Sequence, residues 1–208
     1  GKMIEHKHYG RLRVATAVVL LVAMSSYAAL HIAQTTTDGP LNDMIPGGPL
    51  QSGTLITEAD IDWREVLGGA GECNDGTCPA MDPVELQLLD PAHSRYTGVM
   101  LHEGELYIPC DLGYMWGRFD GTQRHVLHLI YLFKSWHEHA LRDGRVVVRI
   151  DGKRYERQAV RVTDPALDTA LRRQLEDMAR AWVAPDPLAD APTEGPNDIW
   201  FFRLDPRA

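Results

Sequence analysis

Basic residues are scarce in this sequence, and their scarcity excludes one class of ligand. The chain carries 21 Lys and Arg against 29 Asp and Glu, and four of those cations lie within its first 13 residues. Nucleic-acid phosphates are bound by basic surfaces, so nucleic acid is not an expected ligand. The sequence also lacks a nucleophile elbow, a phosphate-binding loop and paired catalytic carboxylates, and nothing in it favours a hydrolase or a kinase.

Charge is absent altogether from residues 14–33, a run of twenty residues without Lys, Arg, Asp or Glu. As a helix rising 1.5 Å per residue, this run reaches roughly 30 Å, the thickness of the bilayer hydrocarbon core. We predict a single transmembrane helix over residues 14–33. A cleaved signal peptide is the competing interpretation, because small residues occur at 26–29.

The charges that flank this run predict its orientation. Lys2, Lys7, Arg11 and Arg13 precede it, and no Lys or Arg follows it before Arg64. Basic flanks stay on the cytoplasmic side of a membrane. We therefore expect residues 1–13 in the cytoplasm and the C-terminal domain in the periplasm, with the protein in a bacterial inner membrane.

Cysteine is rare, with only Cys73, Cys78 and Cys110 present. The first two flank Asn-Asp-Gly, a strong turn former, and a disulfide between Cys73 and Cys78 is expected in an oxidising compartment. Free thiols and metal ligation stay open as alternatives, although metal sites usually need four ligands. Cys110 is expected to be a small buried residue.

Residues 34–83 are predicted to form an extended tether that contains one short helix. Thr, Gly and Pro dominate the first twenty residues of this segment, which show neither a helical nor a strand period. In the helix that follows, Thr57 is the predicted N-cap, and Gly68 and Gly69 are predicted to end it.

Residues 84–208 are predicted to form one soluble α+β domain. The runs "VELQLL", "YTGVML" and "ELYIPC" indicate a three-stranded meander. Asp151-Gly152 between two extended runs indicates a two-residue hairpin. A short helix is expected over residues 135–142, and a terminal strand is expected from Ile199.

A longer helix is predicted to begin near Pro165, which loses no needed hydrogen bond in a first turn. The helix shows one apolar stripe at helical spacing, which predicts that it packs on the sheet. The stripe consists of Leu167, Leu171, Leu175, Met178 and Trp182.

Residues 136–165, with "ALRDGRV" and the hairpin "VVVRIDGKRYERQAVRVTDP", and the closing "WFFRLDP" resemble the split β-barrel superfamily of flavin-binding pyridoxamine-phosphate-oxidase-like proteins. The deazaflavin-dependent, nitroreductase-like branch is the more similar one. The resemblance implies a small antiparallel split β-barrel with a packed helix. The phosphate-gripping turn of the family, of Gly-Arg-Lys-Ser-Gly type, is replaced here by "LDPAHSRYTG", which keeps Ser94 and Arg95.

We therefore expect the fold to be kept without a bound cofactor. If flavin or deazaflavin is bound, the resemblance implies that Arg95, Lys134, Trp136 and His139 surround it. A haem or metal site would use His125 and His128, which share one face of a helix if that segment is helical. Surface or packing roles are the commoner fate of such histidines.

The loop "GYMWGRFDG" gathers residue types that are favoured as anchors in protein interfaces. It predicts a partner-docking site at Tyr114, Trp116, Arg118 and Phe119. Together with the span, it suggests a non-catalytic accessory subunit of a larger membrane complex, an energy-transducing one of photosynthetic or respiratory electron transport. The alternatives are a membrane-tethered flavin or deazaflavin oxidoreductase and a haem- or metal-binding periplasmic protein.

Overall fold

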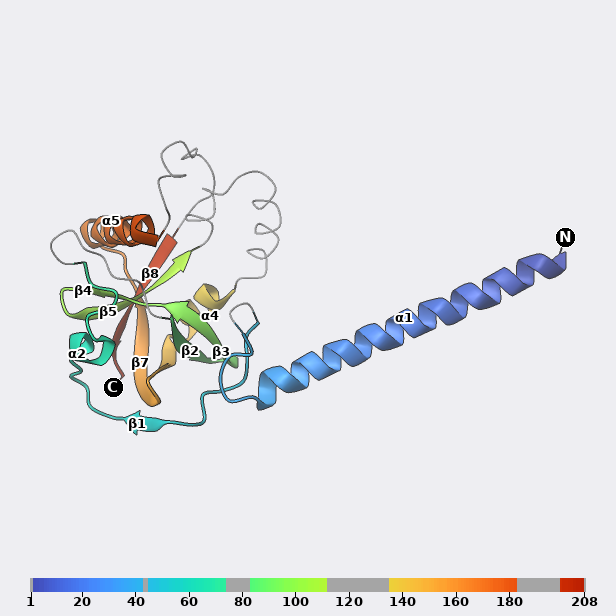
Figure 1. Ribbon diagram of the computed structural model, residues 1–208, viewed down its shortest axis with the longest axis horizontal. Coiled ribbons are helices and arrows are strands. Elements are labelled where there is room, and N and C mark those ends of the chain that lie inside the picture. The colour runs from blue at the N-terminus through green and yellow to red at the C-terminus, as the bar shows by residue number, and fades with distance from the viewer. Residues whose placement is uncertain (1, 43–44, 74–82, 112–134, 183–198, 208) are drawn as a thin grey trace.

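A computed structural model describes residues 2–42, 45–73, 83–111, 135–182 and 199–207 (Figure 1). A long helix, α1 (Lys2–Thr36), projects from a domain built on one curled sheet (Figure 1). Several predictions fall outside the described residues. They concern Cys78, the docking loop with Tyr114, Trp116, Arg118 and Phe119, the candidate ligands His125 and His128, and Lys134.

Helix α1 contains the predicted span. Its part from Thr16 to Thr36 is long and apolar enough to cross a membrane, with a mean hydropathy of 1.8 and none of it buried against the domain. The helix therefore supports a membrane span by its length and composition. A signal sequence has the same properties, so the choice of a retained anchor stays a prediction.

The sheet joins eight strands in the order β3-β2-β6-β7-β8-β5-β4, and β1 lies parallel to β7. All pairs along the path are antiparallel. The strands are β1 (Thr54–Ile56), β2 (Pro83–Leu89), β3 (Ala92–Gly98), β4 (Met100–His102), β5 (Glu105–Asp111), β6 (Arg145–Ile150), β7 (Lys153–Arg161) and β8 (Ile199–Pro206).

The predicted three-stranded meander is confirmed in its neighbouring pairs, but its middle run is divided into two strands, β3 and β4. The apolar runs do form strands, but β2 pairs with β3 and β4 pairs with β5, as two hairpins at opposite ends of the strand order. The chain passes from one hairpin to the other at the buried Val99. Apolar alternation indicates a strand and one buried face, but it does not identify the strand's partner, which here comes from β6 and β8 later in the chain.

The predicted hairpin and helices of residues 135–182 are confirmed. Asp151 and Gly152 both have positive φ, 47° and 72°, between β6 and β7, as the tight hairpin turn requires. Helix α4 (Trp136–Arg142) occupies the expected short segment. Helix α5 (Pro165–Trp182) begins where Asp164 accepts hydrogen bonds from the N–H groups of its first turn.

Both faces of the terminal strand β8 are covered. Each face contributes to a different one of two hydrophobic clusters. Ile199 and Phe201 pack with the apolar stripe of α5, where Leu171, Leu175 and Met178 are buried. Phe202 and Leu204 face the interior of the curled sheet. Helix α5 thus covers the outer face of the sheet at β8. The interior of the curled sheet must be filled by side chains from another element.

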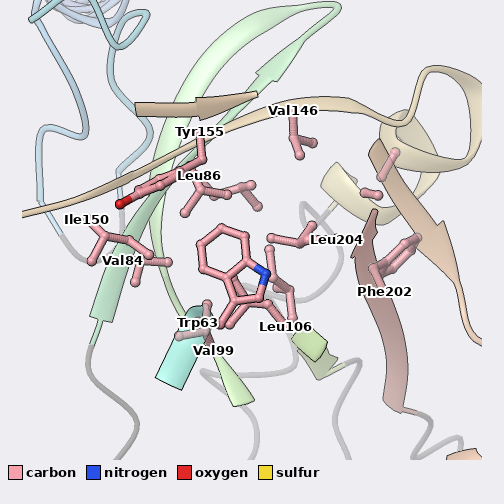
Figure 2. Close-up of a cluster of buried hydrophobic side chains, with 14 of the residues drawn as sticks. Trp63, Val84, Leu86, Val99, Leu106, Val146, Ile150, Tyr155, Phe202 and Leu204 are labelled. Carbon is pink, nitrogen blue, oxygen red and sulfur yellow. The ribbon is translucent and has the colours of Figure 1, made fainter. Parts of the chain in front are cut away.

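Helix α2 (Trp63–Leu67) supplies that filling with the indole of Trp63. The ring lies among aliphatic side chains from several strands, and it meets the ring of Tyr155 edge-on at 5.1 Å between centroids (Figure 2). Gly68 ends the helix in the left-handed conformation, as predicted. The N-cap is Asp62, whose carboxylate accepts from the Glu65 N–H, and the predicted cap at Thr57 is wrong because the chain is still leaving β1 there.

The segment predicted as a tether is bound to the sheet before β1 is reached. Gly47 exchanges backbone hydrogen bonds of 2.9 and 3.1 Å with Ser94 of β3. Leu50 is buried, and its N–H donates to the side-chain oxygen of Gln87 at 2.8 Å. At the opposite end of the strand order, the carbonyl of Gly71 accepts from the N–H of Leu101 in β4 at 2.9 Å.

Candidate functional site

A cation without a charged partner among the described residues lies on strand β3. The side chain of Arg95 is largely buried, and desolvation lowers its pKa to about 10. Its Nε is a buried donor that finds no hydrogen-bond acceptor among the described residues. Buried charges and donors are normally paired, so this guanidinium marks a place where a further group would be stabilised.

Aromatic and thiol groups surround this guanidinium. Its Cζ lies 6.0 Å from the ring centre of Trp136, the first residue of α4. The indole of Trp136 packs on Phe202 at 5.3 Å. Cys110 is a buried cysteine outside any disulfide, and a charge on its thiol would raise the pKa of Arg95. Strands β3, β5 and β8 and helix α4 therefore meet at this point.

Two histidines lie beside the cation. The rings of His93 and His139 meet edge-on, 6.1 Å apart. Burial is the main cause that lowers the pKa of His93, and the nearby charge of Arg95 lowers it further. The Nδ1 of His139 lies 2.6 Å from an Nη of Arg142. Since arginine is always a donor, that nitrogen accepts the hydrogen bond.

The structure brings together three of the four residues that the resemblance implies for a cofactor. Arg95 stacks near Trp136, and His139 reaches the same cluster through His93. Lys134 lies outside the described residues. Ser94 is not available to a ligand, because it is fully buried and its hydroxyl donates to the carbonyl of Gly48 at 2.6 Å.

Sequence reasoning missed His93, although a signal was present. His93 and Arg95 are two residues apart on a strand, so their side chains share one face. The cluster has one buried guanidinium, flat aromatic surfaces and two imidazoles. Such a set of groups is able to hold a carboxylate or phosphate group by charge-assisted hydrogen bonds.

The part of the chain that the structure describes contains no candidate metal site. No set of three or more His, Cys, Asp or Glu residues is gathered there with the geometry for an ion. The weak candidates His125 and His128 lie outside that part and stay a prediction.

The cysteines differ in state. Cys73 is disulfide-bonded, whereas Cys110 is buried and is not part of a disulfide. The predicted partner, Cys78, lies outside the described residues, so the pairing of Cys73 with Cys78 stays a prediction.

No protein-family model and no curated protein matches this sequence. Among solved structures, the chain is similar to a crystal structure from Listeria innocua whose protein carries the name of a pyridoxamine 5'-phosphate oxidase. The identity is 18%, the match covers 61% of this chain and 84% of the other, and the TM-score is 0.37. A likeness of this size carries no information on activity. The curled antiparallel sheet itself fits the split β-barrel that the sequence resemblance implies.

Proposed function

We propose that this chain is a single-span membrane protein whose domain serves as an accessory subunit of a larger membrane assembly. The supporting observation is the attachment of the domain directly after α1. That helix ends at Thr36, and Asp38 already forms an ion pair with Arg149 of β6. A subunit that must meet companions in one orientation needs such a short, fixed connection.

The connection is a network and not a single contact. The guanidinium of Arg149 also pairs with Glu85 of β2, and these hydrogen bonds are the main cause that raises its pKa. The carboxylate of Asp38 accepts from the N–H groups of Gln51 and Ser52 at 2.7 and 3.2 Å. We call residues 37–56 the clasp, because both of its ends are hydrogen-bonded to the sheet.

For the orientation, we propose a cytoplasmic N-terminus and a periplasmic domain, because the basic residues precede the span. Protease added to sealed, right-side-out spheroplasts should digest the domain. Complete protection until the spheroplasts are lysed would place the domain in the cytoplasm and refute this orientation.

Membership of an assembly is tested on native membranes extracted with a mild detergent. The full chain should migrate on native gels in a complex with other membrane proteins at fixed stoichiometry. Arg149→Gln, which frees the clasp, should weaken that complex. Arg145→Gln, on the same strand as Arg149, removes an exposed pair with Asp143 and should not weaken the complex. Migration of the wild-type chain alone would contradict the proposal. Whether the host is energy-transducing stays a prediction.

A second candidate function, a flavin- or deazaflavin-dependent oxidoreductase, is favoured by one observation: the buried Nε of Arg95 has no acceptor among the described residues. If such a cofactor binds, Arg95 would hold an anionic group and Trp136 would contact a flat ring. The absorbance spectrum of the full chain purified from its native membrane decides between the two. Stoichiometric flavin that is lost in Arg95→Gln would support the enzyme, and a spectrum without it would leave the accessory role.

A further inference from the structure

A second buried arginine, Arg157, lies on the inner face of β7. Arg157 is only 3% exposed, and it shares that face with the buried Tyr155 and Ala159. Its Cζ lies 5.2 Å from the ring centre of Trp63. The cation is therefore placed inside the curled sheet, against the indole that fills it.

This cation is weakly compensated. Its hydrogen bonds run to two backbone carbonyls, those of Glu156 at 3.2 Å and Glu58 at 3.3 Å. None of the ion pairs among the described residues includes it. Desolvation is the main cause that lowers its pKa. A buried guanidinium normally faces a carboxylate. The lack of a carboxylate beside Arg157 among the described residues therefore calls for an explanation.

A cavity of about 300 Å³ lies in front of Arg157. Trp63, Leu204 and Pro206 give it apolar walls. Its rim carries the exposed carboxylates of Asp60, Asp62 and Glu105, of which Asp62 also caps α2. The cavity is thus positive at its base and negative at its mouth.

This polarity selects the charge of a ligand. A simple anion would be attracted by Arg157 but repelled by the rim carboxylates. A simple cation would be attracted by the rim carboxylates but repelled by Arg157. A molecule with both charges satisfies both ends. The volume lies at the lower end of the range for ligand pockets, and it suits a molecule of amino-acid size.

We propose that this cavity binds a small zwitterion of the α-amino acid class, with its carboxylate toward Arg157 and its ammonium group toward Asp60 and Glu105. Its side chain would contact the apolar wall of Trp63 and Leu204. This site is separate from the clasp and from the Arg95 cluster, and it adds ligand binding to the proposed accessory role.

The test uses the full chain in detergent micelles and isothermal titration with each of the twenty common L-α-amino acids. The best binder is then compared with its N-acetyl derivative, which lacks the ammonium group, and with its decarboxylated amine. We expect both derivatives to bind at least about tenfold more weakly. The proposal is overturned if no amino acid binds, or if either derivative binds as well as the parent.

Substitutions locate the binding. Arg157→Gln should weaken it at least about tenfold. Arg161→Gln, on an exposed residue of the same strand, should leave it unchanged. Asp60→Asn alters an exposed residue at the rim and should also weaken binding. It replaces Arg157→Gln as the test if that variant does not fold. Binding that is unaffected by the rim and base variants would place the ligand elsewhere and refute the assignment. The native-gel experiment on the assembly does not depend on any of these outcomes.

Discussion

The guanidinium of Arg149 lies 2.8 Å from the carboxylate of Asp38, across 111 residues of sequence. The same guanidinium donates to Glu85 at 2.8 Å. Three segments, namely the residues just after α1, β2 and β6, are therefore joined by one side chain that is only 11% exposed. Arg149 therefore links the segment that follows α1 to the sheet by charge, beside the apolar contact made by the buried Leu50.

Replacing Arg149 by Gln should release the clasp and lower the free energy of unfolding by about 2–3 kcal/mol, between the values for exposed and for buried pairs. All five tryptophans lie outside α1, so their fluorescence reports unfolding of the domain in detergent. Arg145→Gln is the matched control, and its effect should stay within about 1 kcal/mol. Equal effects of the two variants would show that the clasp is not held by charge.

The clasp should also weaken in acid. Hydrogen bonding by Ser52, followed by that from Gln51 and the charge of Arg149, holds the pKa of Asp38 far below its ordinary value of 3.8. A carboxylate whose pKa is lower in the folded chain contributes stability above its unfolded pKa, and this contribution is lost as the pH falls toward the folded value.

The melting temperatures of the wild-type chain and Asp38→Asn measure this contribution. Their difference should be constant above about pH 4 and shrink steadily below it. Asp143, whose pKa is lowered to about 2 mainly by hydrogen bonding from Arg145, titrates in both proteins and cancels in the comparison. A difference that does not change with pH would show that the Asp38 carboxylate contributes nothing.

Removing the indole that fills the sheet should be severe. Trp63→Ala leaves a large cavity among the side chains of Figure 2, and a loss of about 3–5 kcal/mol is expected. Trp63→Phe keeps most of the volume and should lose about 1–2 kcal/mol. Denaturant midpoints measured by circular dichroism test the order. Equal losses would mean that the interior collapses around either replacement.

A buried amide holds α5 to the edge of the sheet. The Nε2 of Gln174 donates to the carbonyls of Gly71 and Leu101 at 3.0 and 2.8 Å, and its Oε1 lies 2.9 Å from the ring of His102. Gln174→Leu removes these donors and should lower the free energy of unfolding by about 2 kcal/mol. The exposed neighbour Arg173 is the control, since Arg173→Gln should change it by less than about 0.5 kcal/mol.

The thiol count is open to direct measurement. Alkylation of the denatured, unreduced chain should modify Cys110 alone, because Cys73 is disulfide-bonded and Cys78 is its predicted partner. Reduction before alkylation should give three modified residues. Mass spectrometry of the peptides distinguishes the cases, and three reactive thiols without reductant would refute the pairing.

Local signals predicted local structure well in this chain. Asp151-Gly152 required its turn, Gly68 ended its helix, and the stripe from Leu167 identified the buried side of α5. The division of the middle run into β3 and β4, at opposite ends of the strand order, was not accessible in this way. It depends on β6 and β8, which lie far along the chain, and apolar alternation does not encode a partner.

The sites divide in the same manner. The grouping of Arg95, Trp136 and His139 was an expectation from the resemblance, and the structure places these residues in one cluster. Arg157 was missed because a basic hairpin is typical of an exposed surface. Its alternation with Tyr155 and Ala159 was the signal that this arginine faces inward. Trp63 was missed because no local pattern reveals which strands a short helix will fill.

The glycines against the two outer strands have a consequence for self-association. Gly47 occupies the free side of β3, where a Cβ would collide with the carbonyl of Gly39, and Gly71 occupies the free side of β4. At these points the backbone groups of the edge strand are already hydrogen-bonded, so the edge strand of a second copy cannot pair with them. Edge-to-edge pairing of two copies is therefore blocked at these two points, and replacing Gly47 by a larger residue would remove the block on β3.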